Sequence, residues 1–351
     1  MIRLGIIGCG NMAATHARSF SATRGVILAA CCDVNGERAR QFAGRWHIPR
    51  WHSDYGEMIS SERLDAVSIV TSDNSHAAIS LAAVRAGLAV LCEKPLATSL
   101  ADARRMRDAA REKGVVTHVN FSYRNAACVQ AAAALIRKGG IGRVLHVEAS
   151  YLQSWLVQDS WGDWRTNESF TWRLSRRHGS AGTLGDVGCH ILDLAGFLCG
   201  PIKEISCRLG TFDKGVPGNR IGPYVLDAND SFVSSVTFEG GGLGTVHATR
   251  WATGQINSLK VRVYGDRGAV DVDLDRSEDS CRMARLGASR HAPAWREVRA
   301  PRVANQYEKF VAAVKRGTSD ESDFDNGVRV QAYLEACAAS DRRGRPEKVR
   351  A

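Results

Sequence analysis

The sequence predicts an α/β protein of two domains, the first built on a parallel sheet and the second an α+β domain with an open, mainly antiparallel sheet. Through about residue 122, short apolar runs alternate with helical patterns, as is typical of a parallel sheet covered on both faces. From residue 143 onward, longer segments alternate apolar and polar residues with period two, which indicates antiparallel strands. A chain of 351 residues also favours two domains. We therefore expect domains at 1–122 and 123–351.

The chain opens with an apolar strand, "IRLGIIG", which runs into a glycine-rich turn and then a helical pattern. The turn reads G-x-G-x-x-A, with Gly8, Gly10 and Ala13 at the fixed positions. Between a strand and a helix this motif is the fingerprint of a Rossmann dinucleotide-binding domain. Gly8 permits the tight turn, Gly10 lets the backbone approach a pyrophosphate, and the helix N-terminus faces the phosphates. The residues expected on the phosphate side are Gly8, Gly10, Asn11 and Met12.

A second buried strand, "GVILAACCD", ends at Asp33, about twenty residues past the glycine motif. A carboxylate there can accept hydrogen bonds from the adenosine ribose hydroxyls and repel a 2′-phosphate, which favours NAD over NADP. Arg38, five residues further on, could reach such a phosphate and keeps NADP possible. Asp33 could instead be a helix N-cap.

Further strand–helix pairs follow: "DAVSIVT" (65–71) with a helix ending at Gly87, "AVLCEKP" (89–95) with a helix over 99–114, and the strand in "VVTHVNFSYR" (115–124). Ligands bind outside the carboxyl ends of parallel strands. We therefore expect the residues at these ends to line the cofactor crevice: Thr71, Ser72, Asn74, His76, Glu93, Lys94 and Asn120.

Lys94 lies between Glu93 and Pro95, where a buried strand ends. A surface ion pair with Glu93 is the alternative to a functional role, but neighbouring strand residues point to opposite faces. At the ligand-binding edge of a sheet, the lysine is interpreted as a functional residue.

The second half contains a helical segment, "AACVQAAAALIRKGG" (126–140), and then alternating strands separated by glycine turns. The pattern predicts an antiparallel sheet with one face solvated or covered by another subunit. Two helices, near 304–316 and 325–341, close the chain and could pack back on the first domain.

The segment "GSAGTLGDVGCHILDLAGFLCG" (179–200) interrupts the strands with a glycine-rich entry into a helix. Asp186, His190 and Asp193 are spaced i, i+4 and i+7, which places them on one helical face. A carboxylate one turn from a histidine can orient the ring, the arrangement of a general base. Two other interpretations stay open: a histidine satisfied within the core, and a metal site.

Composition narrows the function classes. A hydrophobic share of 44% and a charged share of 24% are ordinary for a soluble globular protein, and no apolar run reaches the ~18–20 residues that span a bilayer. The net charge of +10 comes from arginines spread along the chain, which argues against a nucleic-acid partner. Ten scattered cysteines without CxxC pairs, and an N-terminus without a signal peptide, predict a cytoplasmic protein with free thiols and no bound metal.

The glycine motif, Glu93-Lys94-Pro95 and the Asp-x-Gly-x-His core of "GDVGCHILD" together resemble the Gfo/Idh/MocA oxidoreductases. "NFSYR" (120–124) and "TWRL" (171–174) are similar to recurring segments of that family. The resemblance implies a Rossmann domain followed by an α/β domain with an open antiparallel sheet, and homodimers or homotetramers packed through that sheet. It implies catalytic roles for Lys94, Asp186 and His190, and a cis Lys94–Pro95 bond. "TSDNSH" (71–76) lacks the family's usual proline, and "SAGTLGD" (180–186) has fewer glycines.

The predicted activity is the NAD(P)-dependent oxidation of a secondary alcohol on a sugar, a sugar derivative or an inositol-like cyclitol. His190 would accept the hydroxyl proton, Asp186 would orient the imidazole, and Lys94 would stabilise the developing alkoxide. Three alternatives stay open: an NAD-dependent glycosidase that oxidises transiently, an NAD-binding sensor, and a metal-dependent hydrolase. The loops at 151–178 and 213–229 would set specificity. The predicted substrate-binding residues are Lys94, Arg124, Trp172, Arg173, Asp186 and His190.

Overall fold

The computed structural model describes residues 1–287 and 294–351, without the side chains of Glu168 and Ser169. The described chain forms two compact units. The first comprises 1–121 and 304–331, and the second comprises 122–303 and 332–351. The chain passes from the first unit to the second after residue 121, one residue before the expected boundary. The segment 304–331 belongs to the first unit, the arrangement that the sequence analysis allows for the closing helices.

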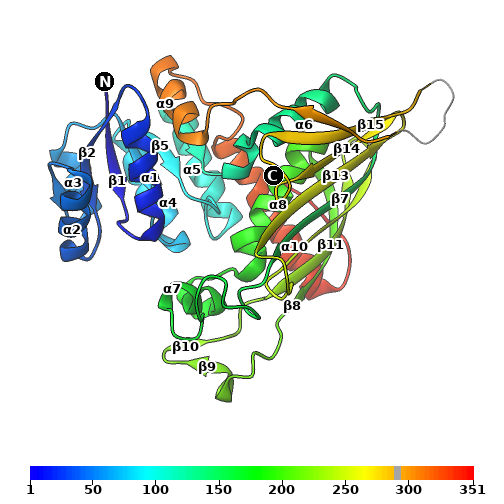
Figure 1. The fold of residues 1–351 in the computed structure, drawn as a ribbon. Coiled ribbons are helices and arrows are strands. Elements are labelled where there is room, and N and C mark those ends of the chain that lie inside the picture. Colours follow the sequence, from blue (N-terminus) through cyan, green and yellow to red (C-terminus); the bar gives the residue numbers. More distant parts are fainter. Residues whose placement is uncertain (288–293) are drawn as a thin grey trace. The chain divides into compact units, whose positions relative to one another are not determined.

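The first unit contains a six-stranded parallel sheet, drawn in blue and cyan in Figure 1. Its strand order is β3-β2-β1-β4-β5-β6, and the order reverses at β1. At such a reversal the crossover connections leave on opposite faces, which opens a crevice at the carboxyl ends of β1 and β4. The strands are β1 (Ile2–Ile7), β2 (Val26–Cys32), β3 (Trp51–His52), β4 (Ala66–Ile69), β5 (Ala89–Cys92) and β6 (Thr117–Val119).

Helices follow most of these strands, and the returning segment adds one more. Tyr307 and Phe310 of the returning segment join the core around Phe20, whose ring centroid lies 5.1 Å from that of Tyr307. The helices are α1 (Asn11–Ala22), α2 (Gly36–Trp46), α3 (Tyr55–Ser61), α4 (His76–Arg85), α5 (Leu100–Lys113) and α9 (Gln306–Arg316), with a 3₁₀ turn η1 (Asp73–Ser75) before α4. Helix α10 (Phe324–Arg343) belongs to the first unit up to Gln331.

The second unit contains a nine-stranded sheet in the order β16-β15-β14-β13-β7-β12-β11-β8-β17. Every neighbouring pair is antiparallel except β12 and β7, which run parallel. The long strands alternate buried and outward residues, as the period-two pattern predicts. The strands are β7 (Val144–Gln153), β8 (Ile202–Gly210), β11 (Ser231–Phe238), β12 (Leu243–Thr249), β13 (Asn257–Gly265), β14 (Gly268–Asp273), β15 (Ser280–Arg285), β16 (Arg296–Arg299) and β17 (Glu347–Lys348), with β9 (Arg220–Ile221) and β10 (Tyr224–Val225) in a separate hairpin.

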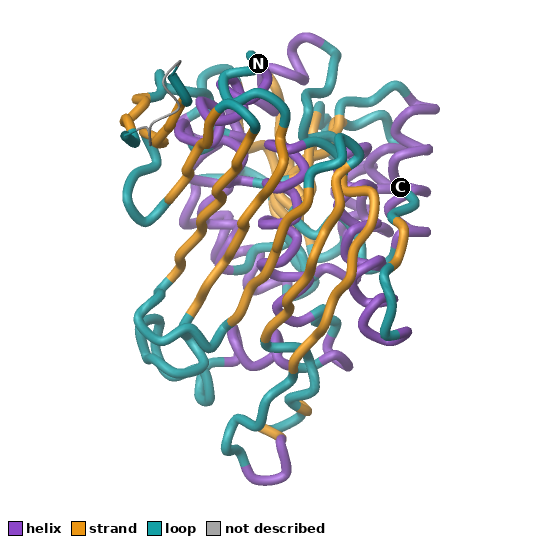
Figure 2. The backbone as a smooth tube through the Cα atoms, turned by 90° about the vertical axis from the view of Figure 1, so that its right-hand side faces the viewer, coloured by secondary structure: helices purple, strands orange, loops and turns teal. Residues whose placement is uncertain are grey.

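Helices of the second unit pack on one face of this sheet, and Figure 2 looks onto the other face, where the strands lie nearest the viewer. Tyr333 and Ser340, in the part of α10 that belongs to the second unit, accept hydrogen bonds from the backbone N–H groups of Ile202 and Cys207 in β8. The other helical elements are α6 (Ala127–Arg137), α7 (Glu168–Thr171), α8 (Cys189–Cys199), η2 (Ser122–Asn125), η3 (Trp172–Leu174), η4 (Arg176–His178), η6 (Pro217–Asn219) and a π-helical turn, η5 (Leu184–Gly188).

The ten cysteines are free, as the sequence predicts, and all except the half-buried Cys199 are buried. Among the described residues, no helix combines the length and the hydrophobicity needed to cross a bilayer.

Candidate functional site

The glycine turn after β1 has the geometry that a dinucleotide needs. Gly8 has φ +95°, and a Cβ at this position would lie 2.6 Å from the carbonyl oxygen of Val70. A Cβ on Gly10 would meet no described atom within 4 Å, so open space borders the backbone there. No described side chain caps the N-terminus of α1, where Asn11 and Met12 are exposed. The first-turn N–H groups of α1 are therefore positioned for a pyrophosphate.

We expect Gly8→Ala to lower the free energy of unfolding by about 1–3 kcal/mol, because its side chain would combine a left-handed backbone with a clash against Val70. Gly10→Ala is the matched control, since φ at residue 10 is −79° and its Cβ position is open. It should unfold like the wild type but bind NADH more weakly. Thermal unfolding measures the stability of both variants, and NADH fluorescence measures their cofactor binding. Equal stability of Gly8→Ala and Gly10→Ala would contradict the requirement for glycine at position 8.

Asp33 follows β2 and is buried. One carboxylate oxygen accepts the N–H of Cys9 at 2.9 Å, and the other accepts the N–H of Asn35 at 2.9 Å. The alternative role as a helix cap is wrong, because Asn35 caps α2 through the N–H of Arg38. Arg38 donates to Asp33 at 3.4 Å and stays half exposed. Asp33 thus braces the glycine turn, and its ribose contact stays a prediction.

The segment after β4 holds Thr71, Ser72 and Asn74 at the sheet edge expected to face the cofactor. The hydroxyl of Ser72 donates to the side-chain oxygen of Asn74 at 2.8 Å, and that of Ser75 donates to the Thr71 hydroxyl at 2.7 Å. Both Ser72 and Asn74 are exposed, so their polar groups can face a ligand. Cofactor contacts by these residues stay predictions.

Lys94 is partly exposed just past the carboxyl end of β5, and its peptide bond to Pro95 is cis, as expected from the family resemblance. Its backbone N–H donates to Glu93 Oε2 at 3.2 Å. The other oxygen of Glu93 bonds His16 Nε2 at 2.8 Å and Asn120 Nδ2 at 2.5 Å, and His16 Nδ1 lies 2.8 Å from the Ser68 hydroxyl.

Burial opposes ionisation of Glu93, but His16, Lys94 and Asn120 together lower the pKa of its carboxyl to about 2. This carboxylate therefore anchors the backbone of Lys94. The sequence predicts cofactor contacts for Glu93 and Asn120. In the structure, the side-chain amide of Asn120 donates a hydrogen bond to the Glu93 carboxylate. His76 does not fit a cofactor contact, because it is fully buried and both its ring nitrogens bond backbone carbonyls.

In the second unit, Asp186 lies in the π-helical turn η5, directly before α8. The side chain of Asn229 fixes the entry to this turn by donating to the Ala181 carbonyl at 2.9 Å and accepting the Leu184 N–H at 2.9 Å. Gly182 is required there, since it has φ +67° and a Cβ would lie 2.5 Å from Asn229. Single π turns occur frequently at functional sites.

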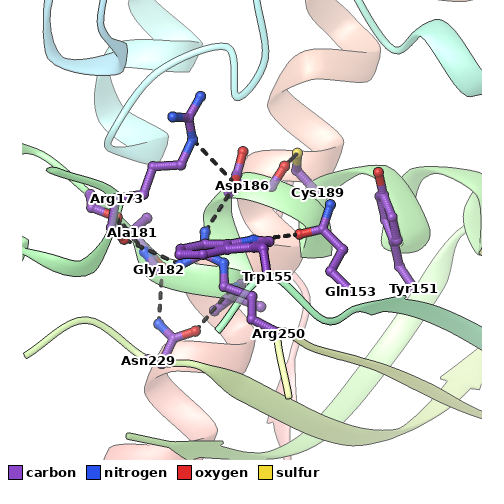
Figure 3. Close-up of polar contacts among 12 residues, drawn as sticks. Tyr151, Gln153, Trp155, Arg173, Ala181, Gly182, Asp186, Cys189, Asn229 and Arg250 are labelled. Atoms are coloured by element: carbon purple, nitrogen blue, oxygen red, sulfur yellow. Dashed lines mark hydrogen bonds and ion pairs between the residues drawn. The ribbon is translucent and has the colours of Figure 1, made fainter. Parts of the chain in front are cut away.

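Two arginines hold the carboxylate of Asp186 (Figure 3). Arg250 Nη2 donates to it at 2.9 Å, and Arg173 Nε lies 3.6 Å away. Arg250 is fully buried, and its guanidinium lies 4.8 Å from the centre of the Trp155 ring. Burial lowers the pKa of Arg250 despite the opposing charge of Asp186. A carboxylate held by guanidinium groups is a poor metal ligand, which argues against the metal-hydrolase alternative.

His190 lies in the first turn of α8, 6% exposed, between aromatic rings. Its ring centroid is 4.9 Å from that of Tyr123, edge to face, and 6.3 Å from that of Tyr151. Burial, with Tyr123 and Asp186 nearby, raises the pKa of Tyr151 well above its ordinary value, so the Tyr151 phenol is a neutral hydrogen-bonding partner. Orientation of His190 by Asp186 stays a prediction.

Asn257 closes a ring of hydrogen bonds with these two phenols. Tyr151 donates to Asn257 Oδ1 at 2.9 Å, and Asn257 Nδ2 donates to the Tyr123 hydroxyl at 3.1 Å. The remaining bond, 2.6 Å between the hydroxyls, is then donated by Tyr123. Gln153 continues the network by donating to Asn257 Oδ1 at 2.9 Å and accepting from Trp155 Nε1 at 3.1 Å. Beside His190 the protein therefore presents ordered amide, hydroxyl and aromatic groups.

Arg124 and Asp193 form a buried bidentate ion pair, with both N–O distances 2.7 Å. The predicted substrate contact of Arg124 does not fit this arrangement, because the guanidinium fork is already engaged with a carboxylate and stacks 4.5 Å from the Phe197 ring centre. Asp193 therefore has a different partner from Asp186, although the sequence places both acids on one helical face. Trp172 is half-buried with the Arg173 guanidinium 4.8 Å from its ring centre, so this pair can still meet a substrate.

Arg124→Leu should destabilise the fold by about 3–5 kcal/mol, because it leaves the Asp193 carboxylate buried without its partner. The double variant Arg124→Leu, Asp193→Leu should recover much of this loss by removing the orphaned charge as well. Denaturant unfolding of the three proteins measures the effect. A single variant as stable as the wild type would contradict a structural role for the pair.

Sequence reasoning missed Tyr123, Tyr151, Gln153, Trp155, Asn257 and Arg250. The period-two pattern of β7 and β13 predicts that their side chains alternate between the two faces of the sheet. It does not predict that polar side chains near the ends of these strands bond one another. One usable signal was present: Tyr151, Gln153 and Trp155 have i, i+2 and i+4 spacing, which directs polar and aromatic groups to one face.

Residues 2–121 match the model of an oxidoreductase family with an NAD-binding Rossmann fold, and residues 129–271 match the GFO/IDH/MocA C-terminal domain. Levoglucosan dehydrogenase of Pseudarthrobacter phenanthrenivorans is 29% identical over 303 residues, which are 79% of this chain and 75% of that protein. D-apiose dehydrogenase of Paraburkholderia graminis is 28% identical over 353 residues, 98% of this chain and 89% of that protein.

A solved structure of levoglucosan dehydrogenase in complex with NADH and levoglucosan has a TM-score of 0.88 and 26% identity, and covers 100% of both chains. The glycine turn and the edge residues of the first unit lie within the NAD-binding match, and Asp186 and His190 lie within the second. The chain belongs to the Gfo/Idh/MocA family of oxidoreductases and uses NAD.

Proposed function

We propose that the protein is a dehydrogenase that oxidises a secondary alcohol of a sugar, a sugar derivative or a cyclitol. The observation that carries the substrate class is the group of side chains beside His190. The exposed amide of Asn257 and the half-buried hydroxyl of Tyr123, which are ordered by bonds to Tyr151 and Gln153, suit the hydroxyls of a sugar. Relatives at 28–29% identity are named for levoglucosan and D-apiose.

In this reaction, bound NAD supplies the hydride acceptor. His190 accepts the proton of the hydroxyl whose carbon loses the hydride, and Asp186 keeps a negative charge close to the resulting imidazolium. Lys94 donates a hydrogen bond to the same oxygen as it gains alkoxide character, which stabilises the transition state more than the ground state. Arg250 and Arg173 hold Asp186, and Glu93 holds the backbone of Lys94.

Spectrophotometry of NADH formation against a panel of anhydrosugars, aldoses, apiose and inositols, with NAD and NADP in parallel, tests this function. We expect oxidation of at least one sugar or cyclitol and a preference for NAD. Release of free sugar from a glycoside without net NADH would support the glycosidase alternative instead. No reaction across the panel, with NADH still bound, would contradict the substrate class.

The outer face of the nine-stranded sheet is proposed as the contact between subunits of a homodimer or homotetramer. Val233 and Leu243 are exposed on this face, and Lys260 and Arg262 pair with acids of the neighbouring strand β14. Such a mixed apolar and polar surface suits a contact between copies. Light scattering of the purified protein tests the proposal, and a monomer would contradict it.

Ten free cysteines support a reducing, cytoplasmic location.

A further inference from the structure

His76, the first residue of α4, is a buried polar group of the first unit to which the proposed reaction gives no role. It is 0% exposed. Its Nδ1 lies 2.9 Å from the carbonyl oxygen of Pro95, and its Nε2 lies 3.2 Å from the carbonyl oxygen of Thr71. These two carbonyls belong to segments that follow different strands, β5 and β4. One side chain therefore ties together two strand ends at the sheet edge expected to face NAD.

The identity of the two partners determines the charge of this ring. A carbonyl oxygen can only accept a hydrogen bond, so both contacts are hydrogen bonds only when both ring nitrogens of His76 donate, as they do in an imidazolium. Burial opposes this charge, but Cys92 of β5, Asp73 of η1 and the Pro95 carbonyl together raise the pKa of His76 to about 10. A neutral ring would leave one nitrogen lone pair facing a buried carbonyl, which is costly.

The residue bonded by His76 adjoins the lysine of the site. On one side of Lys94, its own N–H is bonded to Glu93, which is in turn fixed by His16 and Asn120. On the other side, the carbonyl of Pro95 is bonded to His76. The backbone that carries the Lys94 side chain is thus held from both directions by buried groups.

We propose that His76 is a positioning residue for Lys94: as an imidazolium it binds the carbonyls of Pro95 and Thr71 and fixes the backbone from which Lys94 reaches the substrate oxygen. The inference rests on the proposed role of Lys94. It assigns no cofactor contact to His76. His76 thus differs from Thr71, Ser72 and Asn74, which are partly buried or exposed and stay predicted cofactor contacts.

Two amide variants separate the two hydrogen bonds. The amide of His76→Asn has its donor near the position of Nδ1 and can keep the bond to Pro95. The amide of His76→Gln has its donor near Nε2 and can keep only the bond to Thr71. We expect His76→Gln to lower kcat by up to about 10²-fold, the cost of a small misplacement of a reacting group. His76→Asn should retain most of kcat, and both variants should bind NADH like the wild type.

His118→Asn is the matched control. His118 is also buried in the first unit, in β6, but its Nδ1 faces Asp320 at 3.2 Å instead of a strand-end carbonyl. Its loss should cost stability without lowering kcat. If His76→Gln and His118→Asn lost kcat equally, or if His76→Asn lost more than His76→Gln, the positioning role would be overturned.

Nuclear magnetic resonance gives a readout that does not depend on turnover. In ¹⁵N-labelled wild-type protein at pH 8, the His76 ring should show two protonated nitrogens; a neutral ring would overturn the proposal. After reductive ¹³C-methylation, the Lys94 signal, assigned with Lys94→Met, should shift in His76→Gln and not in His118→Asn. An unmoved Lys94 signal would overturn the positioning role even in an active enzyme. A shifted signal in a protein inactive on every sugar would leave His76 supported and the proposed function refuted.

Discussion

Replacing His190 with asparagine is expected to lower kcat by about 10²–10⁴-fold, because a positioned general base contributes about that much to the rate. Asparagine keeps a polar side chain of similar size between Tyr123 and Tyr151 but cannot accept the alcohol proton. NADH binding should be retained, because the glycine turn proposed to bind the dinucleotide lies in the first unit and His190 lies in the second. Steady-state kinetics and NADH fluorescence measure the two quantities.

His47→Asn is a suitable control for this substitution. His47 ends α2 in the first unit with φ 53°, a left-handed conformation that asparagine tolerates well, and its side chain is exposed. The control should turn over at the wild-type rate. Unchanged turnover in His190→Asn as well would remove His190 from the reaction.

Replacing Lys94 with methionine should lower kcat/KM by about 10²–10³-fold, the usual effect of removing one donor to a developing oxyanion. Methionine keeps an unbranched apolar chain of similar length, so the stem can pack in the same place while the ammonium is lost. The loss should appear mainly in kcat, because a donor that acts on the alkoxide contributes little to ground-state binding.

Lys113→Met provides the matched control, since Lys113 is exposed in the last turn of α5. It should leave kcat/KM unchanged. A Lys94→Met enzyme that lost only affinity for NAD, with kcat preserved, would identify Lys94 as a cofactor contact instead of a hydrogen-bond donor to the substrate.

The first unit could be predicted from its sequence in most respects, because its rules are local. A buried parallel strand must be apolar along its length, and the turn after it must carry residues for the ligand edge. Gly8 illustrates this well: its positive φ and its contact with Val70 leave no room for a Cβ. Lys94 could be found in the same way, from its place where the β5 strand ends.

The local sequence pattern does not predict the direction in which buried side chains point. His76 and Glu93 stand at the predicted strand ends, yet their partners are the Pro95 carbonyl and His16, which a strand pattern does not specify. The sequence predicts Arg124 as a substrate ligand because the polar fork of a guanidinium suits the hydroxyls of a sugar. Its ion pair with Asp193, 69 residues away, depends on how η2 packs against α8.

Arg250 and Asn257 were missed for a related reason. They are single polar residues near the ends of antiparallel strands, positions where polar residues are normally solvated. Their roles come from side chains far away in sequence: Asp186 for Arg250, and Tyr123 and Tyr151 for Asn257. The π-helical turn also escaped prediction, since its residues differ little from those of an ordinary helix.

A crystal structure of the enzyme with NADH and an oxidisable sugar is the decisive measurement. Lys94 Nζ and a ring nitrogen of His190 should both lie about 2.6–3.2 Å from one sugar hydroxyl. The carbon bearing that hydroxyl should face C4 of the nicotinamide. A sugar hydroxyl at that carbon that meets neither side chain, or a Lys94 side chain directed away from the nicotinamide, would contradict the proposed reaction.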